Sequence, residues 1–325
     1  MATLDSFARM EFVHAPTALE HLPRLSYALR RPVYIKRDDQ IGPALGGNKA
    51  RKLEYLLADA KRQHARRVVT FGGLQSNHAR MTAAAARMCA IEPHLFYFER
   101  RPARLTGNLH VAQLLGAKLY FIPIGGSGGM TIERSNRLVH MLATALVGRH
   151  YFIPVGGHHW LGCLGYVRCA IELAAQVRER GLHEAQLICA AGTGGTLAGL
   201  MAGVALANIP IRLLGIDVGK LWKAFPHSIA QVASTICERL GSQRRYTAAD
   251  VPLIQGRYVG TGYAQPTAEA NAAIGRLAQL EGIVLDPIYT GKAMAAMLDL
   301  AERGELGRNT PLIFLHTGGS PALFA

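Results

Sequence analysis

The sequence predicts an α/β protein with one or two mostly parallel sheets covered by helices. Short runs rich in β-branched and aromatic residues recur along the 325 residues, and many end in glycine-rich turns. Alanine- or leucine-rich helical stretches follow these turns, as in RRVVTFGGLQSNHARMTAAAARM at 66–88. Strands that alternate with helices pair in parallel. The strands expected from this alternation span 32–38, 68–71, 94–99, 118–123, 151–157, 187–191, 211–217 and 311–316.

Composition limits the classes of function. Five cysteines are widely spaced with no CxxC pair, so neither disulfides nor a zinc site is predicted. The N-terminal segment resembles neither a signal nor a transit peptide, and we expect a cytoplasmic protein. The net charge of +14 is scattered as single residues and doublets, which argues against nucleic-acid binding. Residues 186–210 lack charges, but a glycine cluster divides them into a strand and a helix, so no membrane span is expected.

The segment GGNKARKLEYLLADAKR at 46–62 places a lysine at the start of a helix. Its apolar face recurs at helical spacing, and Asn48 or a neighbour is suited to cap the first turn, which contains Lys49. The helix dipole disfavours an ammonium there and favours the neutral amine, which suits a nucleophile that attacks an aldehyde. A solvent-exposed helix lysine is the alternative.

Two further turns can hold anions. In GGLQSNHARM at 72–81, Ser76, Asn77 and the backbone amides of Asn77 and His78 can bind a carboxylate at a helix start, although simple helix capping is the alternative. In AAGTGGTLAGL at 190–200, closely spaced glycines let backbone amides approach a phosphate group, although such a turn can also be purely structural. Leu197 stands where a GxGxxG motif needs its third glycine, so a dinucleotide is not indicated. The phosphate turn consists of Gly192, Thr193, Gly194, Gly195 and Thr196.

Near the C-terminus, Tyr289 and Thr290 precede a helical stretch and Thr317 follows an apolar strand. Each is weak alone. Together and in this order, the five segments resemble the D-cysteine desulfhydrase and 1-aminocyclopropane-1-carboxylate deaminase family of pyridoxal 5′-phosphate (PLP) enzymes. The resemblance extends from VYIKRDD to HTGGSPALFA, which is nearly the whole chain.

The resemblance implies a fold-type II architecture similar to the tryptophan synthase β-subunit, with two lobes, each containing a twisted, mostly parallel sheet. PLP is expected in the cleft between them, a small amino acid as substrate, and a homodimer as the assembly. Residues 50–160 are expected to form the small lobe, and 1–49 with 161–325 the large PLP-binding lobe.

The resemblance also implies residue roles. Lys49 looks like the lysine that carries PLP as a Schiff base, and Lys52 like a phosphate contact. The Ser76, Asn77 and His78 loop resembles the site for the substrate carboxylate and the PLP hydroxyl, and Gly192 to Thr196 resembles the phosphate cup. Tyr289 resembles a tyrosine that stacks near PLP and moves protons, and Tyr263 in GTGYAQPT a second active-site tyrosine.

Two positions favour the desulfhydrase branch. The deaminase pattern has Glu and Leu where this chain has Thr290 and Thr317. A carboxylate beside the pyridine nitrogen would make PLP the strong electron sink that opening a cyclopropane demands, whereas threonine cannot. The expected reaction is therefore β-elimination, most simply D-cysteine to pyruvate, sulfide and ammonia. The alternatives are 1-aminocyclopropane-1-carboxylate deamination, L-cysteate sulfo-lysis or another β-substituted-alanine lyase.

One segment departs from the desulfhydrase pattern. After IPVGG this chain has His158, His159 and Trp160 instead of a small polar pair. His158 is expected to contact substrate if these side chains face the cleft, and a position on the lobe surface is the alternative. No metal site is predicted, because adjacent histidines point to opposite faces of an extended chain. A non-catalytic PLP-binding protein is a further alternative, but it would not need Ser76 together with Tyr263 and Tyr289.

Overall fold

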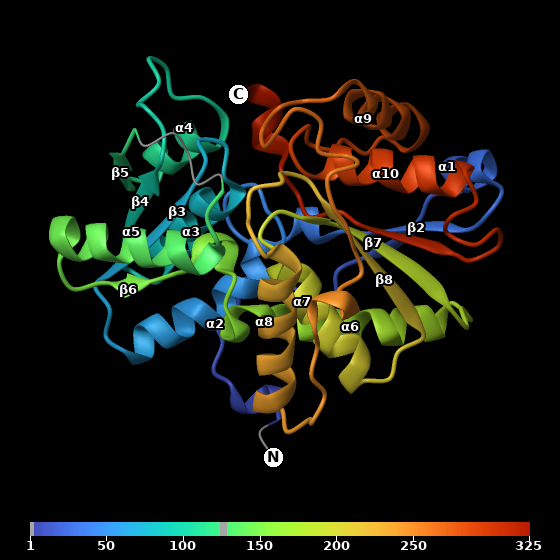
Figure 1. The fold of residues 1–325 in the computed structure, drawn as a ribbon, viewed down its shortest axis with the longest axis horizontal. Coiled ribbons are helices and arrows are strands. Elements are labelled where there is room, and N and C mark those ends of the chain that lie inside the picture. Colours follow the sequence, from blue (N-terminus) through green and yellow to red (C-terminus); the bar gives the residue numbers. More distant parts are fainter. Residues whose placement is uncertain (1–2, 124–128) are drawn as a thin grey trace.

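Two sheets organise the computed structural model, which describes residues 3–123 and 129–325 (Figure 1). The six-stranded sheet has the order β1-β2-β10-β7-β8-β9, and the four-stranded sheet has the order β5-β4-β3-β6. Every pairing is parallel except that of β1 with β2. The predicted α/β class with mostly parallel sheets is confirmed. The strands are β1 Leu19–His21, β2 Val33–Lys36, β3 Arg67–Gly72, β4 Glu92–Tyr97, β5 Lys118–Phe121, β6 Tyr151–Phe152, β7 Ala185–Ala191, β8 Ile211–Asp217, β9 Leu253–Ile254 and β10 Leu312–Leu315.

All eight predicted strands are present. β8 has the predicted bounds, and each of the other seven is shifted at one end or both. The largest difference is in β6, which has only two residues because the chain turns after Pro154 into the short 3-10 segment Val155–Gly157. Gly156 in this turn has a φ of 63°, a left-handed conformation that glycine adopts without steric cost. The short edge strands β1 and β9 were not predicted.

Helices cover both faces of the six-stranded sheet (Figure 1). Alternate residues of β7 point to opposite faces, so Leu187 and Cys189 pack with α6, α7 and α8, while Ile188 and Ala190 pack with α1, α9 and α10. The helices are α1 Pro23–Leu29, α2 Lys49–Arg62, α3 Asn77–Met88, α4 Gly107–Leu114, α5 Ile132–Val147, α6 Trp160–Glu179, α7 Gly195–Leu206, α8 Phe225–Arg239, α9 Ala268–Glu281 and α10 Thr290–Glu302.

The sheets draw on different parts of the chain. The four-stranded sheet comes from residues between 67 and 152, and the strands of the other sheet lie before and after that range. The boundaries of the small lobe at residues 50 and 160 stay a prediction. Within this predicted lobe, residues 124–128 lie outside the described residues. Among the described helices, none is long and apolar enough to cross a membrane. The stretch 186–210 forms most of β7, the glycine turn and α7, as predicted.

All five cysteines are free and buried. Burial raises the pKa of each thiol, to about 12 for Cys169 and Cys189. No disulfide forms between them, in agreement with their spacing.

A buried ion pair fixes helix α2. The Asp38 carboxylate accepts hydrogen bonds from Arg51 Nε at 2.8 Å and from a second Arg51 nitrogen at 2.9 Å. It also accepts from the hydroxyls of Thr17 and Tyr166. Burial alone would raise the pKa of Asp38, but the Arg51 guanidinium, the Lys36 ammonium and the Tyr166 hydroxyl together outweigh it and the pKa is lowered. Arg51 extends further to Glu172 in α6 at 2.8 Å, so the pair joins α2 to the end of β2 and to α6.

We expect the substitution Asp38→Ala to lower the free energy of unfolding by about 3–5 kcal/mol, because it leaves the Arg51 guanidinium buried without its main partner. Urea denaturation followed by circular dichroism measures the loss. The control is Glu184→Ala, which removes the solvent-exposed partner of Arg212 and should cost less than about 1 kcal/mol. Equal, small losses in both variants would contradict a structural role for the Asp38 pair.

Candidate active site

A cavity of about 290 Å³ lies where segments from both sheets meet. The carboxyl ends of β3 and β7 and the loops after β4 and β8 contribute to its wall, as expected for parallel sheets. The predicted residues that line it are Lys49, Lys52, Ser76, Asn77, His78, Gly192, Thr193, Gly194, Gly195, Thr196, Tyr263, Tyr289 and Thr317. His158 is not among the lining residues.

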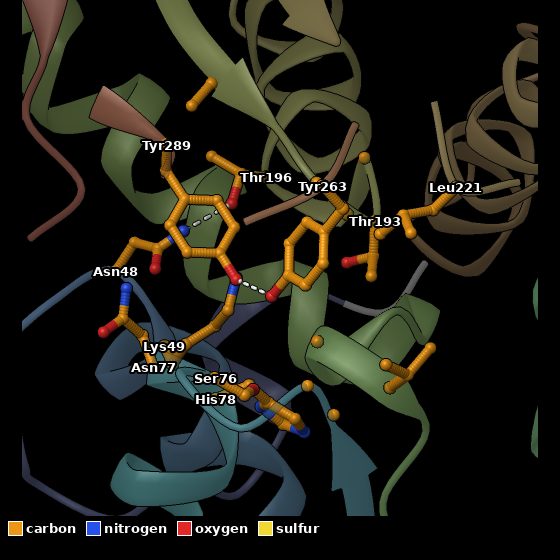
Figure 2. A pocket seen from close by; sticks show the side chains of 18 of the residues that line it. Asn48, Lys49, Ser76, Asn77, His78, Thr193, Thr196, Leu221, Tyr263 and Tyr289 are labelled. Carbon is orange, nitrogen blue, oxygen red and sulfur yellow. Dashed lines mark hydrogen bonds between the residues drawn. The ribbon is translucent and has the colours of Figure 1, made fainter. Parts of the chain in front are cut away.

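Lys49 is the first residue of α2, as predicted, and its side chain extends into the cavity (Figure 2). The predicted capping by Asn48 is wrong, because the Asn48 side chain donates instead to Thr196 Oγ1 at 3.0 Å and so joins the starts of α2 and α7. Burial and the neighbouring Lys52 ammonium lower the pKa of Lys49 well below its usual range, against a smaller opposite effect of Cys163. The neutral amine needed for attack on an aldehyde is therefore favoured.

The glycine turn between β7 and α7 has the shape of an anion site. A Cβ built on Gly195 would lie 2.9 Å from Lys52 Nζ, so glycine is what allows the ammonium to approach the helix start. Lys52 Nζ also donates to the Gly156 carbonyl at 3.1 Å. Free backbone N–H groups at the start of α7 and this ammonium together suit one phosphate group.

The Ser76 loop meets the cavity at the start of α3. Ser76 Oγ accepts from the Ala79 amide at 3.2 Å, so the capping alternative is realised while Ser76 also lines the cavity. Asn77 Oδ1 accepts from Asn108 Nδ2 at 2.9 Å, and the Asn77 NH₂ group is thereby directed into the cavity as a donor (Figure 2). His78 Nε2 bonds Thr70 Oγ1 at 2.9 Å. Burial and the two lysines lower the pKa of His78 well below 6.5, so its ring is neutral.

Two tyrosines enter the cavity opposite Lys49 (Figure 2). The hydroxyls of Tyr263 and Tyr289 share a hydrogen bond. Burial raises the pKa of Tyr263 to about 12 and raises that of Tyr289 well above 10. Both phenols are therefore protonated at neutral pH, and the pair can hold or pass a proton.

The two threonines that favoured the desulfhydrase branch occupy different environments. Thr317 lines the cavity, and its carbonyl accepts from the Asn48 amide at 3.0 Å. Thr290 does not line the cavity, because its hydroxyl donates to Asp286 Oδ1 at 2.6 Å at the start of α10. Of the two threonines, only Thr317 lines the cavity, so a direct action of Thr290 on the chemistry is not supported.

The histidine segment also differs from expectation. His158 is buried beneath the glycine turn and not at the cavity wall, so the predicted substrate contact is not supported. Its position is equally unlike the alternative of an exposed surface residue. His159 and Trp160 are partly buried outside the cavity, where Trp160 packs against Phe7 and Arg239. These side chains do not narrow the cleft.

Sequence reasoning missed several lining residues. Leu221 and Trp222 follow the end of β8, and Trp222 Nε1 donates to the Gly192 carbonyl at 2.9 Å. Glu99 follows β4 and accepts from the Leu74 amide at 3.3 Å. Their position just beyond strand ends was the available signal, but no motif marked them. Phe71 and Phe98 add apolar wall.

Residues 10–318 match the family described as pyridoxal-phosphate dependent enzyme. The chain belongs to this family. Its members bind PLP, and the two-sheet architecture is fold-type II. The glycine turn beside Lys52, the lysine at the head of α2 and the Asn77 donor form a set of groups that fits a phosphorylated aldehyde.

Solved structures agree with the family. The structure of a homologue of 1-aminocyclopropane-1-carboxylate (ACC) deaminase is similar to this one, with 35% sequence identity and a TM-score of 0.88. The match covers 99% of this chain and 94% of the homologue. O-ureido-L-serine synthase is 18% identical, with a TM-score of 0.64, over 98% of this chain and 92% of its own, and shows the shared fold alone.

We expect borohydride to fix the cofactor to the peptide containing Lys49 at pH 7.5, because the lowered pKa keeps this amine neutral where an ordinary lysine is protonated. Peptide mapping by mass spectrometry identifies the labelled residue. Lys292 is the internal control, since it is buried with a lowered pKa but bonds three backbone carbonyls and does not line the cavity. Label on Lys292, or retained label in Lys49→Ala, would contradict the assignment.

Proposed function

We propose that the protein catalyses β-elimination on a small amino acid, with D-cysteine converted to pyruvate, sulfide and ammonia. When bound, PLP supplies an electron sink for charge that develops at the substrate Cα. The observation that carries the choice of reaction is Thr317, a hydroxyl in the cavity where the deaminase pattern has an apolar leucine and relies on a nearby glutamate.

Carboxylates near the cavity do not replace that glutamate. Asp286 is enclosed by four hydrogen bonds, from the amides of Ile288, Tyr289 and Thr290 and from the Thr290 hydroxyl, and does not line the cavity. Glu99 lines it from the side of the Ser76 loop, where it bonds Leu74. A threonine beside the ring nitrogen of PLP makes the cofactor a weaker electron sink than a glutamate would. A weaker sink is enough for β-elimination, because the thiol that leaves Cβ carries away the negative charge.

We propose that the other residues of the cavity bind and orient the cofactor and the substrate. Lys52 and the turn from Gly192 to Thr196 hold the cofactor phosphate, and Lys49 holds the cofactor covalently. The Asn77 NH₂ group would donate to the ring oxygen of the cofactor, and the Thr317 hydroxyl would bind its ring nitrogen. Ser76, Asn77 and His78 at the start of α3 hold the substrate carboxylate, since amides at a helix N-terminus favour an anion.

Proton transfer is assigned to three side chains. Lys49 Nζ, whose pKa is lowered by burial, would take the Cα proton of the bound substrate. The Tyr263 ring lies close to the Ser76 loop, since a Cβ on Gly73 would be 2.9 Å from Tyr263 Cε1. Its phenol is therefore placed to give a proton to the leaving sulfur, and Tyr289 can return one through the shared hydrogen bond.

The purified protein with PLP should release sulfide and pyruvate in equal amounts from D-cysteine, because both come from one elimination. Pyruvate is followed with lactate dehydrogenase and sulfide by methylene blue formation. L-cysteine, D-serine and L-cysteate are the comparison substrates, and a larger kcat/KM with L-cysteate would indicate a sulfo-lyase. No pyruvate from D-cysteine would rule out the preferred substrate.

A second candidate is 1-aminocyclopropane-1-carboxylate (ACC) deaminase, favoured by the 35% identity to an ACC deaminase homologue. In that case 2-oxobutanoate and ammonia should form from ACC while D-cysteine gives no sulfide. For either activity we propose a homodimer, as the resemblance implies, and a cytoplasmic location, as expected from the N-terminal segment and the cysteine spacing.

The substitution Tyr263→Phe should lower kcat by about 10²-fold or more with a smaller change in KM, because it removes a proton donor and not a binding surface. The absorbance of bound PLP should persist. Tyr258→Phe is the matched control, since Tyr258 bonds Asp299 outside the cavity. An unchanged kcat in Tyr263→Phe would remove this residue from the proton path.

A further inference from the structure

Glu99 is the single acidic residue among the described residues that line the cavity. It follows the end of β4 and is partly buried. Its Oε1 accepts a hydrogen bond from the Leu74 amide at 3.3 Å, just before Ser76. Within the described chain no arginine or lysine forms a salt bridge with it. The cavity wall therefore carries a carboxylate that is not paired with a cation.

The basic residues of the cavity have other roles. Lys49, Lys52 and His78 are the basic side chains among the described lining residues. Lys49 is assigned to the cofactor aldehyde and Lys52 to its phosphate, while burial and the two lysines lower the pKa of His78 and leave its ring neutral. The amides at the start of α3 suit the one carboxylate that every amino acid carries. A second anionic group on the substrate would lose its hydration in this cavity without gaining a cation.

Glu99 lies on the side of the cavity to which the leaving group is assigned. A Cβ built on Gly73 would be 3.5 Å from Glu99 Oε1 and 3.5 Å from the Tyr263 hydroxyl oxygen, so the carboxylate and the phenol converge on this glycine. Gly73 itself lines the cavity. Because the Tyr263 phenol is the proposed proton donor to the leaving sulfur, a charge on that substituent would lie close to Glu99.

We propose that Glu99 determines the charge of the substrate side chain: it excludes amino acids with an anionic β-substituent, such as a sulfonate or a carboxylate, and admits neutral or cationic ones. This inference rests on the proposed function and deepens it, because it names the class of side chain that the cavity accepts. Selection of this kind works by repulsion, since like charges that face each other in a binding site oppose binding strongly.

The same carboxylate bears on how the sulfur leaves. In the proposed elimination the Cβ–S bond breaks, its electron pair stays on sulfur, and the Tyr263 phenol supplies a proton, so a cysteine thiol departs as neutral H₂S. Burial raises the pKa of Tyr263 to about 12 against the hydrogen bond with Tyr289, and the Glu99 carboxylate adds to the increase. A sulfonate would instead leave as sulfite, with its negative charge beside Glu99.

Titration of the holoenzyme with asparagine and aspartate tests the proposal, because their side chains have the same shape and differ in charge. Neither carries a thiol or hydroxyl at Cβ, so the absorbance of the bound cofactor reports binding without elimination. Both enantiomers are measured. In the configuration that binds, the wild-type protein should prefer asparagine by about 10–100-fold, the range expected when two like charges meet in a partly solvated site. Glu99→Gln should reduce this preference by about tenfold or more through tighter binding of aspartate.

Glutamine keeps an acceptor for the Leu74 amide, so Glu99→Gln changes the charge and not the hydrogen bond. Glu92→Gln is the matched control, since it changes the net charge equally but lies at the other end of β4 and does not line the cavity. It should keep the wild-type preference for asparagine. If Glu99→Gln does not fold, as judged by circular dichroism, Glu99→Ala provides the comparison.

Two results would overturn the proposal. One is asparagine that binds the wild-type protein no better than aspartate in either configuration, and the other is a preference that persists unchanged without the Glu99 charge. Absence of pyruvate from D-cysteine would instead contradict the proposed reaction. Because the titration measures binding and not turnover, its result is independent of that assay.

Discussion

The ion pair of Arg51 with Asp38 is the constraint on which the cavity depends. Lys49 and Lys52 are three residues apart and so lie on one side of α2, while Arg51 between them is anchored to Asp38 and Glu172. This anchor fixes the rotation of the helix, and with it the direction of both amines. Two adjacent buried ammonium groups would repel each other. Burial lowers the pKa of both lysines, and the lowering is large for Lys49, which favours its neutral amine and reduces the repulsion.

Contacts between separate segments complete the cavity. Asn48 donates to Thr196, Trp222 donates to the Gly192 carbonyl, and the hydroxyls of Tyr263 and Tyr289 share a hydrogen bond. Each of these bonds connects two cavity-lining segments that are distant in the sequence. Gly195 is required for this packing, because the Cβ of any other residue at this position would be too close to Lys52 Nζ and His158 Nδ1. The phosphate turn is thereby part of the packing between α2, α6 and α7.

Patterns of local sequence were enough for most of the architecture. Strands with β-branched or aromatic residues and a glycine turn at the end were visible. The family resemblance placed Lys49, Ser76, Thr193 and Tyr289 in one cleft, and these four residues line the same cavity. The edge strands β1 and β9 were missed because two or three residues are too few to show alternation.

Other features depend on tertiary geometry. The placement of His158 was not predictable, because Gly156 and Gly157 adopt φ values of 63° and 62° and redirect the chain just before it. Thr290 adjoins a cavity residue in sequence, yet Asp286 takes its hydroxyl because α10 starts at that residue. The orientation of His158 thus follows from the backbone conformation of the two preceding glycines, and that of Thr290 from a capping contact four residues earlier in the same segment.

The buried cysteines have a chemical consequence. The thiolate is the reactive form of cysteine, and burial raises the pKa of all five thiols and leaves at most 8% of any of these residues exposed. Such thiols do not add to the aldehyde of the cofactor, nor do they exchange with thiols or polysulfides in solution. The native protein should therefore withstand alkylating reagents and air oxidation without added reductant.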